Sequence, residues 1–192
     1  MRKVSLDDVS GIERYAKVRD DARRRIIEIK RHRRIPLGDR VTLVFENFDT
    51  VLYQIQEMCL VERIVDIDKV REEIRVYNEL LPSERELSAT LLIEVTDPTR
   101  IVEDLHSLVG IDECVRFVVN GKEFPAHFAP GQSTEDRLSA VQYVRFALSE
   151  EAASELARAG SRVEVKIEHP RYRAGHALSE DERASLARDL AA

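Results

Sequence analysis

The stretch that decides the fold is PLGDRVTLVFENFDTVLYQIQEMCLVERI, which runs from residue 36 to residue 64. Its VTLVFE segment (41–46) is short and rich in β-branched and aromatic residues, which is typical of a strand. From Phe48 to Ile64 the apolar residues recur at helical spacing and fill two sectors of the helical wheel. A helix that is apolar on two sides is mostly buried, so this stretch predicts a strand followed by a core helix.

An amphipathic, Arg-rich helix is expected before this stretch. Between Ile12 and about Arg33 the apolar residues recur every three or four positions, and Pro36 and Gly38 end the pattern. Residues 1–40 carry 13 Lys and Arg against 7 Asp and Glu, whereas the other residues carry 17 against 29, and the net charge is −6. Because acidic residues are interleaved with the basic ones, we interpret this helix as packing on the acidic body of the same protein.

The remaining chain alternates short strands with single helices. Strands are expected at residues 88–95, 114–119, 122–128, 139–148 and 162–168. Helices are expected from Asp66 or Asp68 to Leu81, from Asp97-Pro98 to Gly110, from Ser149 to Gly160, and after a capping box formed by Ser179 and Glu182. Asn120-Gly121 is the strongest hairpin signal in the chain, and residues 129–138 predict a polar loop.

These elements predict an α+β fold, with an antiparallel or mixed sheet of about five to six strands and N-terminal helices packed on it. Helices dominate residues 1–82 and strands dominate residues 83–192. Since no Pro- or Gly-rich linker separates the two parts, we expect a single domain over residues 1–192.

The composition favours a cytoplasmic protein without a membrane partner. No window approaches the roughly 20 apolar residues that cross a bilayer, and the N-terminus lacks the apolar region of a secretory signal. Cys59 and Cys114 lie far apart without a CxxC spacing, which favours two thiols in a reducing compartment over a disulfide.

Three carboxylates, Glu46, Glu94 and Glu168, follow or end predicted strands. If they met at one sheet edge they could hold a divalent cation or act in acid–base chemistry. Strand alternation, however, puts Glu94 and Glu168 on solvent faces, and antiparallel neighbours end at opposite edges of a sheet. We therefore do not favour a site of this kind.

A candidate pocket lies around the predicted core helix. On the helical wheel Glu62 falls within the apolar stripe and Glu57 is flanked by apolar residues, with Gln54 and Gln56 nearby. Burying a carboxylate costs several kcal/mol unless it is paired. An arginine of the first helix, or Arg145 of a later strand, could supply the partner. A structural ion pair is the interpretation that we favour, and a pocket lined by these five residues, with raised carboxylate pKa values, is the alternative.

No cofactor is predicted. The histidines show neither HxH nor HExxH spacing, and the chain has no glycine-rich phosphate loop. His127, Glu168 and His169 could meet in space and bind a divalent metal, but such a site needs three or four ligands, and we do not favour it. The RRRIIEIKRHRR run (23–34) could bind phosphates. The acidic body of the protein argues against a nucleic-acid partner.

Several motifs together resemble a known family. They are ERYAKVRDDARRRIIEIKRHRRIPLG (13–38), TLVFE (42–46), YQIQEM (53–58), VERI (61–64), YNELLPSERELSATLLIE (77–94) and EHPRY (168–172). They look like the bacterial domain-of-unknown-function family 3501, and the similarity covers nearly the whole chain. The resemblance carries over no catalytic residues. Family members are often encoded beside rubrerythrin-like and iron–sulfur proteins, which implies a role near peroxide defence or electron transfer and a redox-protein partner.

Three functional hypotheses follow. The first is a binding or accessory protein of redox or peroxide-stress metabolism, whose site is built around the Gln54–Glu62 helix. The second is a small, metal-dependent enzyme that uses Glu57 or Glu62 with His127 or His169. The third and weakest is nucleic-acid binding through the basic first helix. The sequence leaves open both the substrate and whether the protein forms a homo-oligomer.

Overall fold

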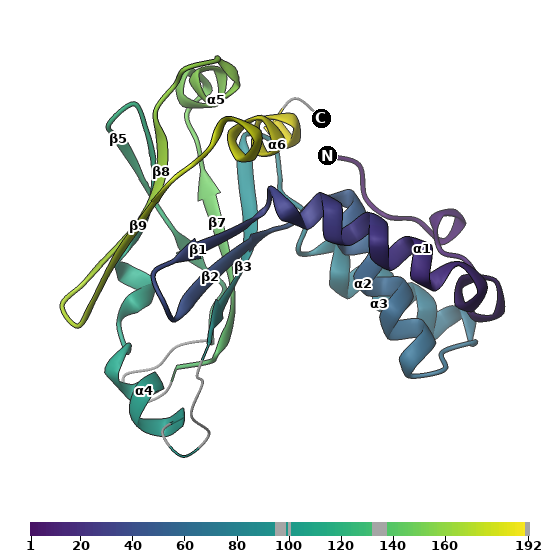
Figure 1. Cartoon of the computed structure of the whole chain (residues 1–192). Helices are drawn as coiled ribbons and strands as arrows, with labels where there is room; N and C mark the ends of the chain where they lie inside the picture. The colour runs from purple at the N-terminus through teal and green to yellow at the C-terminus, as the bar shows by residue number, and fades with distance from the viewer. Residues whose placement is uncertain (95–98, 100, 132–137, 191–192) are drawn as a thin grey trace.

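The computed structural model describes residues 1–94, 99, 101–131 and 138–190. These residues form six α-helices and two antiparallel sheets, which confirms the α+β class expected from the sequence (Figure 1). The expected helix start at Asp97-Pro98 and most of the expected loop at 129–138 lie outside the described residues.

The two sheets face each other as a sandwich. The five-stranded sheet has the order β1 (Arg34–Leu37), β2 (Val41–Phe45), β3 (Glu86–Ile93), β7 (Val141–Ala147), β6 (His127–Phe128). The four-stranded sheet has the order β5 (Lys122–Pro125), β4 (Val115–Val119), β8 (Val163–His169), β9 (Tyr172–Ala177). Asn120 and Gly121 both have positive φ, of 48° and 85°, and form the predicted hairpin turn between β4 and β5.

Two strands were not anticipated from the sequence, and both lie at sheet edges. β1 contains Pro36, which an edge strand tolerates because it needs no second row of backbone hydrogen bonds. β9 lacks a regular apolar alternation. It is held by Tyr172, whose hydroxyl donates to the Leu37 carbonyl and accepts from the Arg40 amide at 3.1 Å. A side chain at Gly38 would collide with this hydroxyl, so the turn between β1 and β2 needs a glycine.

The sandwich has a continuous apolar core between the sheets. Phe45, Phe117 and Phe146 come from β2, β4 and β7, and their ring centroids lie 5.5–6.1 Å apart. Val163, Val165 and Ile167 of β8 point into this core, as their alternation predicts. The segment expected as one strand at 122–128 is divided, because the chain passes from one sheet to the other between β5 and β6.

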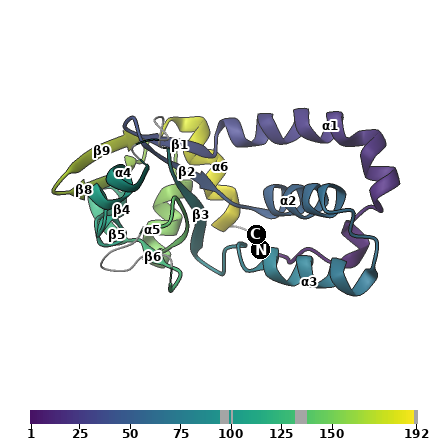
Figure 2. The ribbon, with the colours of Figure 1, turned by 90° about the horizontal axis from the view of Figure 1, so that it is seen from below.

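The first three helices form an arm that extends from one end of the sandwich (Figures 1 and 2). The helices and helical turns are η1 (Leu6–Asp8), α1 (Ile12–Arg31), α2 (Phe48–Val61), α3 (Ile67–Asn78), α4 (Ile101–Ser107), η3 (Ile111–Glu113), α5 (Glu150–Ala157) and α6 (Glu180–Leu190). We call η1 and α1–α3 the helical arm. None of the helices in the described part of the chain has the length and apolar character that crossing a bilayer requires.

The helical arm has a core of its own. Val51, Ile55 and Cys59 of α2 pack with Ile74 of α3, separately from the core of the sandwich. In Figure 2, α2 lies between α1 and α3, which explains why its sequence is apolar on two sides. The expectation that these helices pack on the sheet is therefore only partly met, since they pack mainly on one another.

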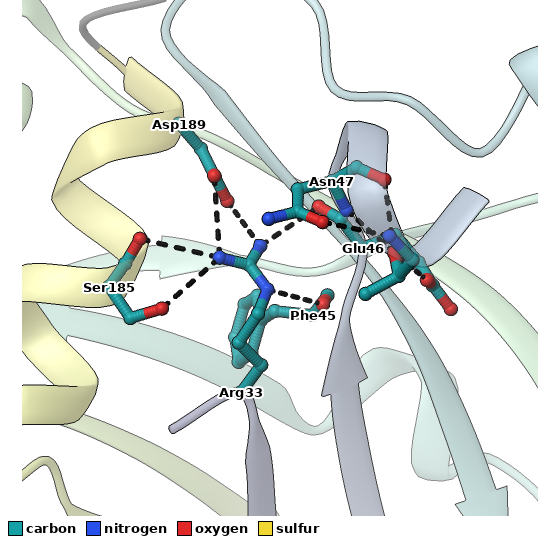
Figure 3. Close-up of polar contacts among 7 residues, drawn as sticks. Arg33, Phe45, Glu46, Asn47, Ser185 and Asp189 are labelled. Carbon is teal, nitrogen blue, oxygen red and sulfur yellow. Dashed lines mark hydrogen bonds and ion pairs between the residues drawn. The ribbon is translucent and has the colours of Figure 1, made fainter. Parts of the chain in front are cut away.

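Arg33 fastens the helical arm to the sandwich (Figure 3). It follows α1, is 1% exposed, and forms an ion pair with Asp189 of α6. Its Nε donates to the Phe45 carbonyl at 2.9 Å, and its terminal amino groups donate to the Glu46 carbonyl at 3.0 Å and to Ser185 at 3.3 Å. Burial raises the pKa of the Asp189 carboxyl although Arg33 opposes the shift, so these contacts have to offset a large desolvation cost.

Replacing Asp189 with alanine is expected to lower the free energy of unfolding by about 3–5 kcal/mol, because it leaves the buried Arg33 charge without a counter-ion. The matched change Asp21→Ala removes the carboxylate partner of Arg24 in an exposed pair, and it should cost less than about 1 kcal/mol. Urea unfolding measures both values. Equal losses in the two variants would contradict the role given to the buried pair.

Candidate functional site

Glu57 of α2 forms an ion pair with the first helix. Its carboxylate accepts from Arg19 at 2.7 and 3.0 Å and from the Tyr15 hydroxyl at 2.8 Å. The hydrogen bond from Arg19 is the main reason that the pKa of Glu57 is lowered, while burial and then Glu57 raise the pKa of Tyr15. This is the structural ion pair that the helical wheel favoured, with its partner on α1 rather than at Arg145.

The two glutamines of α2 also make structural contacts. Gln56 is buried and bonds the backbone N–H and carbonyl of Ser10 at 2.9 and 3.0 Å, which anchors the segment before α1. Gln54 donates to the Glu46 carboxylate at 3.1 Å. Both side chains therefore have partners within the protein.

The expectation that Glu62 lies in the apolar stripe is wrong. The helix ends at Val61, and Glu62 is its exposed C-cap. Arg63 has φ of +54°, which turns the chain out of the helix. The wheel extended the helix to Ile64, three residues past its end, and so assigned Glu62 to a face that it does not share.

Glu46 is a buried carboxylate with three neutral donors. It is 3% exposed and accepts from the Thr50 hydroxyl at 2.5 Å, from the Thr90 hydroxyl at 2.8 Å and from Gln54. The antiparallel pairing of β2 with β3 puts Glu46 and Glu94 at opposite ends, as the sequence predicted. Glu168 is exposed on β8 of the other sheet, so the three carboxylates do not converge.

The histidine candidates are also separated. His169 is buried, its Nε2 lies 3.0 Å from the Val109 carbonyl, and its Nδ1 accepts from the Arg171 amide at 3.2 Å. Glu168 faces solvent beside Lys166. His127 lies on β6, the edge strand of the five-stranded sheet. Within the part of the chain that the structure describes, no three His, Cys, Asp or Glu side chains are grouped to hold a metal ion.

One site with the shape of a binding pocket is a cleft between α3 and the β6–β7 edge of the sandwich. We call it the arm–sheet cleft. Its volume is about 700 Å³. The lining residues are Glu73, Val76, Tyr77, Glu79 and Leu80 on one wall and His127, Phe128, Ala129, Pro130, Tyr143 and Arg145 on the other. Two of the residues singled out from the sequence, Arg145 and His127, border it.

Arg145 connects the two walls of the arm–sheet cleft through polar contacts. Its guanidinium pairs with the Glu86 carboxylate, donates to the Glu79 carbonyl, and reaches the Leu81 carbonyl at 3.4 Å. Glu79 and Leu81 belong to the segment that leaves α3, and Arg145 lies on β7. Arg145 therefore fixes the end of the helical arm against the sheet.

Aromatic and apolar side chains line both walls. Tyr143 on β7 and Val76 on α3 are large hydrophobic residues, yet their exposed fractions are 42% and 46%. Tyr77 is half-buried, and its pKa is raised, first by burial and then by the nearby charges of Glu73 and Tyr143. The periodicity of α3 identified Tyr77 as a packing residue, but no sequence pattern indicated that it faces a cleft.

The Glu57 ion pair should contribute pH-dependent stability. Because the folded-state pKa of Glu57 is depressed, the contribution is complete above its ordinary value of 4.5 and is lost as the pH falls through the lower, folded-state value. Glu57→Gln should therefore lower the free energy of unfolding by about 1–2 kcal/mol at neutral pH. The difference from wild type should shrink below pH 4.5.

Chemical unfolding at a series of pH values measures this difference. Glu62→Gln makes the same substitution at the exposed end of α2 and should change stability little at any pH. A Glu57→Gln effect that is constant from pH 7 to pH 3 would rule out the ion pair as its source.

The similarity to known proteins extends over nearly the whole chain. Residues 3–190 match a family model described as "Protein of unknown function (DUF3501)". A crystal structure of a novel protein of unknown function from Burkholderia pseudomallei K96243 is 33% identical, with a TM-score of 0.91, and the alignment covers 98% of this chain and 100% of that one. A search of functionally curated proteins finds no match. The fold described above is therefore shared from end to end with that relative.

Proposed function

Because this chain belongs to the DUF3501 family of proteins of unknown function, we propose a function from its own geometry: it is a binding or accessory protein, and the arm–sheet cleft is its ligand site. The observation that carries the proposal is the cleft itself. Small-molecule sites are concave, measure roughly 300–1,000 Å³, and are lined by apolar and aromatic side chains with a few polar groups. The arm–sheet cleft, at about 700 Å³, has this character.

The position of the cleft supports the same proposal. Ligand sites occur preferentially where two structural units meet. One wall belongs to the helical arm, which has its own core, and the other belongs to the sandwich. The contacts of Arg145 across the base keep the two walls at a fixed separation, which limits the reorganisation that binding requires.

The redox part of the proposal has a different basis. A role near peroxide defence or electron transfer, and a redox-protein partner, rest on the neighbours of related genes alone. A cytoplasmic location is supported by the two cysteines, which are free, with Cys59 buried in the helical arm and Cys114 half-buried. An accessory protein that delivers or senses a small molecule in such a system is compatible with the free cysteines.

The other two hypotheses have less support. An enzyme using Glu57 or Glu62 with His127 or His169 would need a glutamate and a histidine to meet. Glu57 bonds Arg19, Glu62 is the exposed C-cap of α2, and His169 bonds the Val109 carbonyl. Nucleic-acid binding would use the basic side chains of α1. Four of these pair with carboxylates of the same chain, namely Arg19–Glu57, Arg24–Asp21, Arg25–Asp49 and Arg31–Glu28.

The ligand site can be tested with N-phenyl-1-naphthylamine, a neutral aromatic probe whose fluorescence rises in an apolar site. Wild-type protein is expected to bind it, and Tyr143→Ser should weaken binding about tenfold, because the substitution removes an aromatic wall. Fluorescence titration at constant protein concentration measures both dissociation constants.

Val141→Ser is the matched control. Val141 lies on the same face of β7, is 46% exposed, and does not line the cleft. Its binding should equal that of wild type. If wild-type protein does not bind the probe, or if the Tyr143→Ser and Val141→Ser variants bind it with equal affinity, the arm–sheet cleft is not the ligand site.

A further inference from the structure

The charges that face the arm–sheet cleft are predominantly negative. Glu73 and Glu79 lie on the α3 wall. Glu79 is exposed and shares Arg75 with Glu72, at 3.5 and 2.7 Å. Glu73 is half-buried, and no arginine or lysine in the described parts of the chain pairs with it. Among the described residues, the wall therefore presents a carboxylate without a cationic partner.

Arg145, the arginine that lines the cleft, does not offset the negative charge of Glu73 and Glu79. Arg145 borders the cleft, but its guanidinium is occupied by the Glu86 carboxylate and by the carbonyls of Glu79 and Leu81. A bound anion would have to displace these contacts while approaching Glu73 and Glu79. His127, on the opposite wall, is an imidazole and can donate or accept.

Aromatic side chains also line the arm–sheet cleft. Tyr77 and Tyr143 come from opposite walls and lie close enough for the charge of Tyr143 to contribute to the raised pKa of Tyr77, and Phe128 lines the same cleft. Burial and the neighbouring charges raise the pKa of Tyr77, so its phenol is neutral at neutral pH, and its side chain lines the cleft. Aromatic faces with a nearby carboxylate are the groups that bind ammonium ions through cation–π and charge interactions.

We propose that the arm–sheet cleft selects a small organic cation, a protonated or quaternary amine attached to an apolar body. The ammonium group lies against Glu73 and the rings of Tyr77 and Tyr143, and the apolar body packs against Val76, Leu80 and Phe128. A bare metal ion does not fit this lining, because hard cations require several oxygen ligands and most of the walls are apolar. This inference rests on the proposed function, since it names the ligand class of the same site.

The experiment compares three fluorescent aromatic probes of different charge on the full-length protein. They are the cation 4-[4-(dimethylamino)styryl]-N-methylpyridinium, the neutral N-phenyl-1-naphthylamine, and the anion 8-anilino-1-naphthalenesulfonate. The cation is expected to bind at least about tenfold more tightly than the anion at low salt, and added salt should reduce this preference.

The key variant is Glu73→Gln, which removes the charge and keeps the shape. It should weaken binding of the cation about five- to tenfold and leave the neutral probe unchanged. Glu72→Gln is the matched control on the same helix, because Glu72 is exposed, pairs with Arg75 and does not line the cleft. Both variants should unfold at the same urea concentration as wild type to within experimental error, because Glu72 is exposed and the half-buried Glu73 has no ion pair with a described arginine or lysine to lose.

The outcomes separate this inference from the proposed function. If wild-type protein binds none of the three probes, both the proposed function and this inference are overturned. Retained binding of the neutral probe, with no preference for the cation and no effect of Glu73→Gln, overturns the inference alone. Competition distinguishes the source of the cation. Displacement of the cationic dye by benzyltrimethylammonium supports a small organic cation as the ligand. Displacement by pentalysine but not by benzyltrimethylammonium would show that the cleft binds a basic peptide, and it would overturn the proposal of a small organic cation.

Discussion

The buried guanidinium of Arg33 is the interaction on which the arrangement of the two units depends. A charged group at 1% exposure is stable only when its donors are satisfied, and the contacts that satisfy Arg33 come from separate parts of the chain. They include the carbonyls at the end of β2 and the side chains of Ser185 and Asp189 on α6 (Figure 3). Arg33 thereby joins the start of the sheet, the entrance to α2 and the C-terminal helix at one point.

A second arginine has the same function at the other crossing between the units. The chain passes between the helical arm and the sandwich near Arg33, near Glu46, and in the segment from α3 to β3. Arg33 stands at the first crossing and binds the Phe45 and Glu46 carbonyls at the second, and Arg145 binds the Glu79 and Leu81 carbonyls at the third. Because each unit has its own apolar core, polar contacts at these crossings fix the orientation of one unit relative to the other. The arm–sheet cleft exists only while that orientation is kept.

The sequence predicted those features that local patterns control. The VTLVFE strand, the Asn120-Gly121 turn and the alternation of β8 were correct, and so was the doubly apolar helix predicted at 48–64, except that it ends at Val61. Backbone periodicity and turn conformation depend on neighbouring residues. The features that the sequence did not predict depend on residues that are distant in the chain. β1 and β9 are strands because they pair along sheet edges, and the division of residues 122–128 follows from the packing of two sheets instead of one.

The sequence by itself indicated that Glu57 lies among apolar residues and favoured an ion pair for it, because an unpaired buried carboxylate costs several kcal/mol. It also favoured pairing of the basic N-terminal segment within the protein over binding to an acidic partner. Only the tertiary structure decided which residues meet. Glu57 bonds Arg19 instead of Arg145, and Arg33 bonds Asp189, 156 residues away. The arm–sheet cleft likewise appears only when α3 lies beside β7. The physical reason is that periodicity fixes the direction of a side chain along its own element, whereas contacts between elements depend on how the whole chain packs.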